Sequence, residues 1–327
     1  MAIGMLRAGM AGGIAAWLGF TLPSAVLMTG FACGLSLAGG VAHAAWLHGL
    51  KIVTVAVVAQ AVWSMGRTLC PDRVRASMAV GGAIVALAVP SAAGQVGAIV
   101  AGGVTGWLAL PAPAAPTGGA LHAGLRRRTA LAVLAVFLAL LAGLPVLAAA
   151  TGNHALTLVD RFYRAGALVF GGGHVVLPLL QQAVVVPGWI APDAFLAGYG
   201  AAQALPGPLF SFAAYLGAAM GPPPSGLAGA VLCLAAIYLP SWLLLVGVLP
   251  FWDRLRRRAP VQSALRGVNA TVVGLLLAAL YTPVWTSAIT GPGDVGIGLL
   301  AFLALVFWHL PPWLVVLLGG ATAAALR

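Results

Sequence analysis

Residues 14–28 read IAAWLGFTLPSAVLM and residues 231–245 read VLCLAAIYLPSWLLL, two apolar segments with Leu-Pro-Ser at the same place. In the first copy Gly49 follows the proline by 26 residues, and in the second copy Gly267 follows it by 27. In each copy this glycine lies at the start of a second apolar segment. The two stretches therefore predict an internal repeat whose units are long apolar helices.

The composition of the whole chain agrees with helices in a membrane. Hydrophobic residues make up 62% of the 327 residues, charged residues only 6%, and the mean hydropathy is +1.06. A soluble domain carries about 25% charged residues, whereas lipid can cover a surface that has so little charge. The apolar runs are continuous, while a membrane barrel would alternate over about ten residues. The sequence predicts an all-α polytopic integral membrane protein.

The apolar runs give the candidate spans. A membrane span needs about 20 apolar residues, and several runs here are short or interrupted by Pro and Gly. We therefore expect nine to eleven transmembrane helices, some of them broken. The candidates are 9–33, 44–66, 76–93, 95–110, 129–150, 160–185, 193–217, 224–249, 261–283, 294–309 and 311–326.

The basic residues predict the topology. The formal charge of +11 comes from 16 Lys and Arg that stand in short clusters between apolar runs, a pattern of membrane topology and not of nucleic-acid binding. Arg-rich loops near 67–75, 112–128 and 252–260 are predicted to be cytoplasmic, and the loops at 34–43 and 284–293, which lack Lys and Arg, are predicted to be outside. This places the N-terminus inside and the C-terminus outside, in a multi-pass protein of the inner (plasma) membrane.

Where a loop of one copy is Arg-rich, the corresponding loop of the other copy is uncharged (34–43 against 252–260, and 67–75 against 284–293). Matched segments are therefore expected to cross the membrane in opposite directions. That is the pattern of an inverted repeat, which many secondary transporters use. We predict a first repeat over 1–111, a basic linker over 112–128 and a second repeat over 129–327. Residues 155–217 precede the matched region of the second copy and have no counterpart in the first. The first repeat is therefore expected to lack its two opening helices, either because the true start lies upstream of Met1 or because the protein is shortened.

The first candidate for a binding segment lies in the stretch without a counterpart, where Gly171, Gly172 and Gly173 precede His174. Three consecutive glycines disfavour a regular helix by about 1 kcal/mol each relative to Ala. At membrane depth an interrupted helix is tolerated only against protein or a watery cavity. Its bare N–H groups favour anions, and His174 could donate a hydrogen bond to an oxyanion or relay a proton.

A second interruption is predicted about thirty residues later. Two prolines remove backbone donors and break the helix there, and the neighbouring polar side chains can supply donors in their place. The residues concerned are Gln203, Pro206, Gly207, Pro208, Ser211 and Tyr215. Two such interruptions facing each other would form a cradle for an oxyanion. Close helix packing is the structural alternative for each one taken alone.

The charged residues favour an anion as the substrate. The chain has no Glu, and its five Asp are expected in loops or near the ends of spans, whereas a cation transporter usually keeps a carboxylate in its core. Lys51 and Arg164 are expected inside or near the start of helices, where an unpaired charge is costly enough to indicate function. Arg164 could instead form a structural ion pair with Asp160 at i,i+4.

The two interrupted segments also carry a family resemblance. FGGGHVVLPLL at 170–180, QALPGPLFSFAAYLG at 203–217 and WLHGLKIVTVAVVAQAVW at 46–63 resemble segments of the chromate ion transporter family. The resemblance covers nearly all of the chain and implies a two-halved membrane protein that exports chromate, with sulfate as a close analogue. The family's first half normally opens with FGGP-type and PGP-type segments, which are not present here.

Several functions remain open at this point. The leading hypothesis is export of chromate or a related tetrahedral oxyanion, driven by membrane potential or a proton gradient. The alternatives are uptake of sulfate or a related anion, and an inactive or partner-dependent shortened subunit. We expect no enzyme, because no carboxylate pair or His cluster is available for acid–base work. We also expect no cofactor, no metal and no nucleic acid, with the lipid bilayer as surroundings and a homodimer as one possible assembly.

Overall fold

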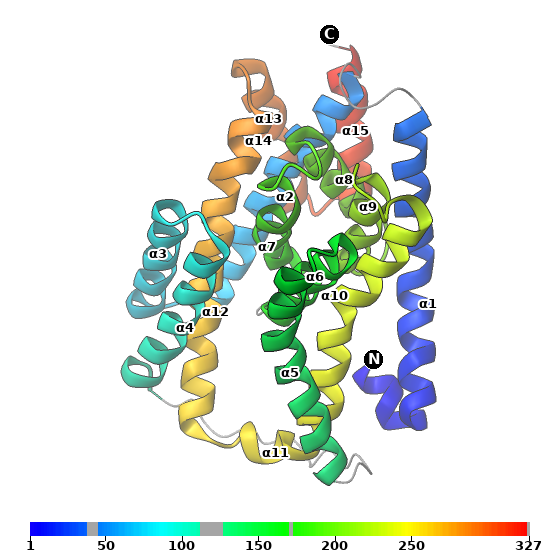
Figure 1. Ribbon diagram of the computed structural model, residues 1–327. Helices are drawn as coiled ribbons and strands as arrows, with labels where there is room; N and C mark the ends of the chain where they lie inside the picture. Colours follow the sequence, from blue (N-terminus) through cyan, green and yellow to red (C-terminus); the bar gives the residue numbers. More distant parts are fainter. Residues whose placement is uncertain (38–44, 112–126, 170–172, 326–327) are drawn as a thin grey trace.

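The computed structural model describes residues 1–37, 45–111, 127–169 and 173–325, and in these ranges all regular structure is helical (Figure 1). The elements are α1 (Ala2–Leu37), α2 (Ala45–Leu69), α3 (Arg73–Ala88), α4 (Ala92–Ala109), α5 (Arg127–Thr151), α6 (His154–Ala167), η1 (Gly173–Val175), α7 (Val176–Leu180), η2 (Gln181–Val185), α8 (Pro192–Ala204), η3 (Leu209–Ser211), α9 (Phe212–Ala219), α10 (Gly226–Val248), η4 (Leu249–Phe251), α11 (Trp252–Leu255), α12 (Ala259–Ala279), η5 (Leu280–Trp285), α13 (Thr286–Ala288), α14 (Pro292–Val306) and α15 (Pro312–Ala325).

Within the described ranges, six helices are long and apolar enough to cross a membrane: α1, α2, α4, α5, α10 and α12, the last with its continuation to Ala288. This confirms the prediction of an all-α polytopic membrane protein. The expected span 193–217 is divided into shorter helices by a non-helical connection at Leu205–Pro208, and in the span 160–185 helix α6 ends at Ala167 and the next described helix, η1, begins at Gly173. The number of complete crossings, nine to eleven, stays a prediction.

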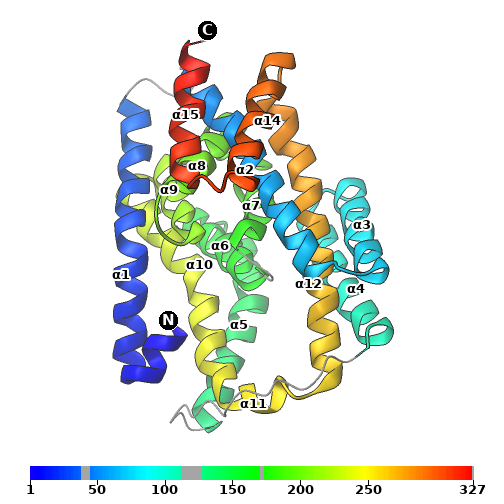
Figure 2. The same cartoon turned by 180° about the vertical axis from the view of Figure 1, so that it is seen from behind.

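The matched segments of the predicted repeat run in opposite directions. α1 rises toward the end of the molecule where the C-terminus lies and α10 descends from it, while α2 descends and α12 rises (Figures 1 and 2). Thr21 and Tyr238, each the eighth residue of its matched segment, contact each other: Thr21 Oγ1 donates a hydrogen bond to Tyr238 Oη at 3.4 Å. This contact joins α1 to α10, and the inverted repeat itself stays a prediction.

The two helical hairpins are exchanged between the copies. The hairpin of α3 and α4 follows α2 in the chain but packs mainly on α12. The hairpin of α14 and α15 follows α12 in the chain but packs mainly on α2. Each hairpin therefore covers a long helix from the other half of the chain.

Small residues make the close packing of α4 on α12 possible. A Cβ atom added at Gly267 would overlap the carbonyl oxygen of Gly102 and lie 2.6 Å from the Cα of Gly106. The backbones of the two helices thus touch at these glycines. Such contacts between small residues are the usual way in which membrane helices approach closely, because apolar burial alone does not favour association in lipid.

Two Arg-rich stretches lie at the end of the molecule opposite the C-terminus (Figure 1). One is the start of α5, and the other is the segment that contains α11. This is the arrangement that the predicted sidedness requires. Residues 112–126 of the predicted linker lie outside the described residues, and its last two residues, Arg127 and Arg128, begin α5.

The start of α6 is fixed by a side-chain cap. The Asn153 side-chain oxygen accepts hydrogen bonds from the backbone N–H groups of Ala155 at 2.9 Å and Leu156 at 3.3 Å. We expect Asn153→Ala to lower the free energy of unfolding by about 1 kcal/mol, because two N–H groups lose their acceptor. Thermal unfolding in detergent measures this loss. Asn153→Asp keeps the acceptor and should unfold like the wild type; equal stability of the Ala and Asp variants would contradict the cap.

Candidate functional site

The two interruptions predicted from Gly and Pro lie next to each other. η1, which begins at Gly173, contacts η3, which ends at Ser211. Between α8 and η3 the chain leaves the helix over Leu205–Pro208, where Pro206 and Pro208 cannot donate. Gly171 and Gly172 lie outside the described residues.

The second interruption rests against the middle of both matched helices. A Cβ atom at Gly207 would come within 2.5 Å of Ser24 Oγ in α1, and the Phe210 ring lies 5.2 Å from the ring of Tyr238 in α10. Ser24 is buried, and so is Ser211. The second interruption therefore lies against both α1 and α10, the helices that hold the two matched segments.

A polar cluster bridges the two interrupted segments. His174 Nδ1 lies 3.0 Å from the hydroxyl oxygen of Tyr199 in α8. The Gln203 amide lies beside the same hydroxyl, yet its buried Nε2 makes no hydrogen bond of good geometry to the described residues. We call His174, Tyr199 and Gln203 the Tyr199 cluster. Among the described residues this amide has no well-formed hydrogen bond, and such buried groups are rare because each costs about 1–3 kcal/mol.

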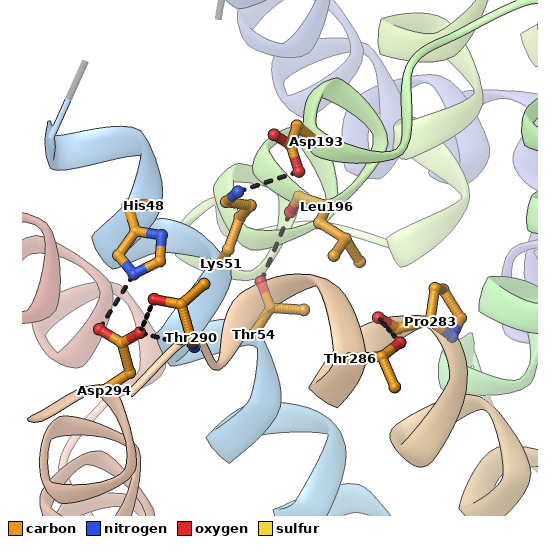
Figure 3. A network of polar contacts seen from close by, with 9 residues as sticks. All are labelled: His48, Lys51, Thr54, Asp193, Leu196, Pro283, Thr286, Thr290 and Asp294. Carbon is orange, nitrogen blue, oxygen red and sulfur yellow. Dashed lines mark hydrogen bonds and ion pairs between the residues drawn. The ribbon is translucent and has the colours of Figure 1, made fainter. Parts of the chain in front are cut away.

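Lys51 has a partner of its own in α8 (Figure 3). Its Nζ forms an ion pair with Asp193 Oδ1 at 2.9 Å, which joins α2 to the first turn of α8. One turn earlier in α2, His48 Nε2 lies 3.0 Å from Asp294 Oδ1, and Asp294 also accepts from the Thr290 hydroxyl and backbone N–H. These contacts tie α2 to its neighbours near its start.

The Tyr215 hydroxyl also has a partner outside the Tyr199 cluster, because it donates a hydrogen bond to the carbonyl of Ala194 at 2.8 Å. Arg164 pairs with Asp160 at 2.7 Å, the i,i+4 pair considered from the sequence. Both residues line a cavity of about 920 Å³ together with Leu168 at the end of α6. Seven of the twelve residues predicted for binding lie in or next to the described parts of the two interruptions: Gly173, His174, Gln203, Pro206, Gly207, Pro208 and Ser211.

Sequence reasoning did not select Tyr199, although it connects the two halves of the cluster. Tyr199 precedes Gln203 by four residues in α8, so both lie on one face of the helix. A polar aromatic residue one turn before a Gln at the end of a broken helix was the signal available for it.

Comparisons with known proteins bear on the whole chain. A family model described as "Chromate transporter" matches residues 1–107 and 156–324. A chromate transport protein of Pseudomonas aeruginosa is 30% identical over 295 residues, which is 84% of this chain and 64% of that protein. The uncharacterized transporter YwrB of Bacillus subtilis is 34% identical over 166 residues, 49% of this chain and 82% of that protein.

A further relative is a chromate transport protein of Cupriavidus metallidurans, 29% identical over 120 residues, which is 36% of this chain and 29% of that protein. This chain thus spans less than two thirds of the length of the two chromate transport proteins named. No solved structure matches it.

Proposed function

Because this chain belongs to the chromate transporter family, we propose that it is a secondary transporter that exports chromate, or a related tetrahedral oxyanion, across the cytoplasmic membrane. The observation that carries the proposal is the Tyr199 cluster at the two interruptions. Its buried Gln203 Nε2 makes no well-formed hydrogen bond to the described residues, and an oxyanion oxygen would accept one from it. The substrate is held by hydrogen-bond donors, with no carboxylate of the cluster to repel it.

The membrane potential favours this direction. Moving two negative charges out of a cell with a negative interior gains about 4.6 kcal/mol at 100 mV, from about 2.3 kcal/mol per charge. Export therefore runs on the potential alone or is coupled to proton entry. The chain works as a transporter without catalysis and without a cofactor, and a homodimer is its possible assembly.

Two buried tyrosines provide a matched test of this site. Tyr199→Phe removes the hydroxyl between His174 and Gln203, whereas Tyr215→Phe removes a hydroxyl that bonds a backbone carbonyl near the start of α8. We expect wild-type protein to lower chromate accumulation in cells, Tyr199→Phe to lose this effect by about tenfold, and Tyr215→Phe to keep most of it. Uptake of radiolabelled chromate into cells with equal amounts of each variant measures the difference.

The possible outcomes distinguish export, uptake and an inactive chain. If Tyr199→Phe exports chromate as well as the wild type does, the Tyr199 cluster is not the binding site. If expression of the wild type raises chromate accumulation, the direction is uptake. Competition with sulfate would then show whether the transported anion is sulfate or chromate. If no variant changes accumulation while all reach the membrane, the chain is inactive alone and depends on a partner.

A further inference from the structure

The cavity of about 920 Å³ lies apart from the Tyr199 cluster and has its own polar lining. It is bounded by the start of α4, by α6 and by the η2 turn, with one residue from α5. Its polar side chains come from three of these elements and are Ser91, Gln95, Asp160, Arg161, Arg164 and Gln182.

The charges in the cavity do not cancel. Arg164 is paired with Asp160 at 2.7 Å. Arg161 donates to the carbonyl of Ala183 and stacks at 4.2 Å over the ring of Trp189. Among the residues that the structure describes, no carboxylate lies within ion-pair distance of Arg161. The lining thus carries two guanidinium groups and one carboxylate, which leaves a net positive charge.

The start of α4 adds backbone donors to this charge. α4 is 18 residues long, and Ala92 and Ala93 of its first turn line the cavity. The cap at Ser91 accepts from the Gly94 N–H group, so the preceding N–H groups have no partner within the helix. A helix N-terminus of this kind carries about half a positive charge and favours anions.

Gln95 adds a buried polar group to the lining of the cavity. The residue is 5% exposed and lines the cavity, yet its Oε1 has no hydrogen-bond partner among the described residues. Turning the amide by 180° places its NH₂ group at the same position, because oxygen and nitrogen of the amide have nearly the same size. Gln95 thus brings an amide, with its N–H donors, to the lining that also holds the two arginines and the start of α4.

We propose that this cavity is a second oxyanion-binding site, which takes a tetrahedral dianion such as sulfate or chromate together with part of its hydration shell. Arg161 and Arg164 supply the charge, and Gln95 and the first turn of α4 supply directed donors. Asp160 holds Arg164 and limits the affinity, so the anion can leave. The site does not depend on the identity of the transported ion, and it is distinct from the Tyr199 cluster.

Binding of radiolabelled sulfate to the purified full-length protein tests the site. Arg161→Gln and Arg164→Gln are each expected to weaken binding at least tenfold, because each removes a charge-assisted hydrogen bond. Asp160→Asn is expected to strengthen binding on the order of fivefold, because it removes the repelling charge. A gain in affinity cannot result from misfolding, so this variant keeps the test decisive if an arginine variant does not fold.

Arg67→Gln is the matched control, because Arg67 stacks over Trp63 at 5.9 Å as Arg161 does over Trp189, but it does not line the cavity. Its sulfate affinity should equal that of the wild type. Wild-type affinity in both Arg161→Gln and Asp160→Asn would overturn the second site. Tyr199→Phe separates this inference from the proposed function: it should bind sulfate in the cavity normally while it loses chromate export.

Discussion

Gly267→Leu is expected to prevent assembly of the folded protein. Gly267 lies where α12 crosses α4, and a Cβ atom at this position would overlap the carbonyl oxygen of Gly102 and lie 2.6 Å from the Cα of Gly106. The obstacle is backbone on both sides, so no side-chain rotation can relieve it. Inserting atoms into a packed core already costs about 1–3 kcal/mol where side chains can move, and we expect a larger loss here.

The measurement is the monodisperse fraction of a fluorescent fusion after extraction into detergent, by size-exclusion chromatography. Gly66→Leu in α2 is the matched control, because a Cβ atom at Gly66 would meet nothing within 4 Å. Replacing an unconstrained helical Gly should stabilise the helix by up to about 1 kcal/mol. The monodisperse fraction of Gly319→Leu in α15 should lie between those of the other two variants. The new side chain there meets the Val53 side chain, which can move, and not backbone. A wild-type profile for Gly267→Leu would show that the α4–α12 contact is not as close as described.

Gly207→Leu is expected to abolish chromate export while the protein still folds. The residue lies in the interruption between α8 and η3, and its Cβ atom would come within 2.5 Å of Ser24 Oγ and 2.7 Å of Ser24 Cβ. The larger side chain must push the interruption away from α1, which displaces Gln203 four residues earlier, in α8. Small misplacements of a positioning group can lower a rate on the order of 100-fold, so export should fall at least tenfold.

Gly221→Leu serves as the control, since that glycine lies in a nearby connection with nothing within 4 Å of its Cβ position. A second variant tests the cause. In a Gly207→Ala background, Ser24→Gly removes the atoms that the new methyl group would strike, and part of the lost export should return. If Gly207→Ala and the double variant export equally poorly, the contact with Ser24 is not what sets the position of the interruption.

The interruptions could be predicted from the sequence because their causes are local. The backbone preferences of the glycines near Gly173 and the missing N–H groups of Pro206 and Pro208 act within a few residues, whatever surrounds them. The prediction that the two interruptions face each other also agrees with the contact of η1 and η3.

The positions of single charged and polar side chains could not be predicted in the same way. Lys51 and Tyr215 were expected at the binding site because of their residue types. In the structure Lys51 pairs with Asp193, which lies far away in the sequence. Tyr215 bonds to the carbonyl of Ala194, which lies 21 residues earlier. Those partners depend on how α2 and α9 pack on α8. The exchange of the hairpins depends likewise on long-range contacts between helices, for which the apolar runs carry no specific signal.

The exchanged hairpins have a consequence for biosynthesis. A ribosome delivers α3 and α4 to the membrane long before it has made α12, the helix on which they pack, and α2 receives the hairpin of α14 and α15 only when the last residues emerge. During most of translation, therefore, the glycines of α4 face lipid or a chaperone. A chain released before α14 is made would leave one side of α2 without its partner helices. Membrane proteases could then recognise unfinished molecules by the exposed face of α2.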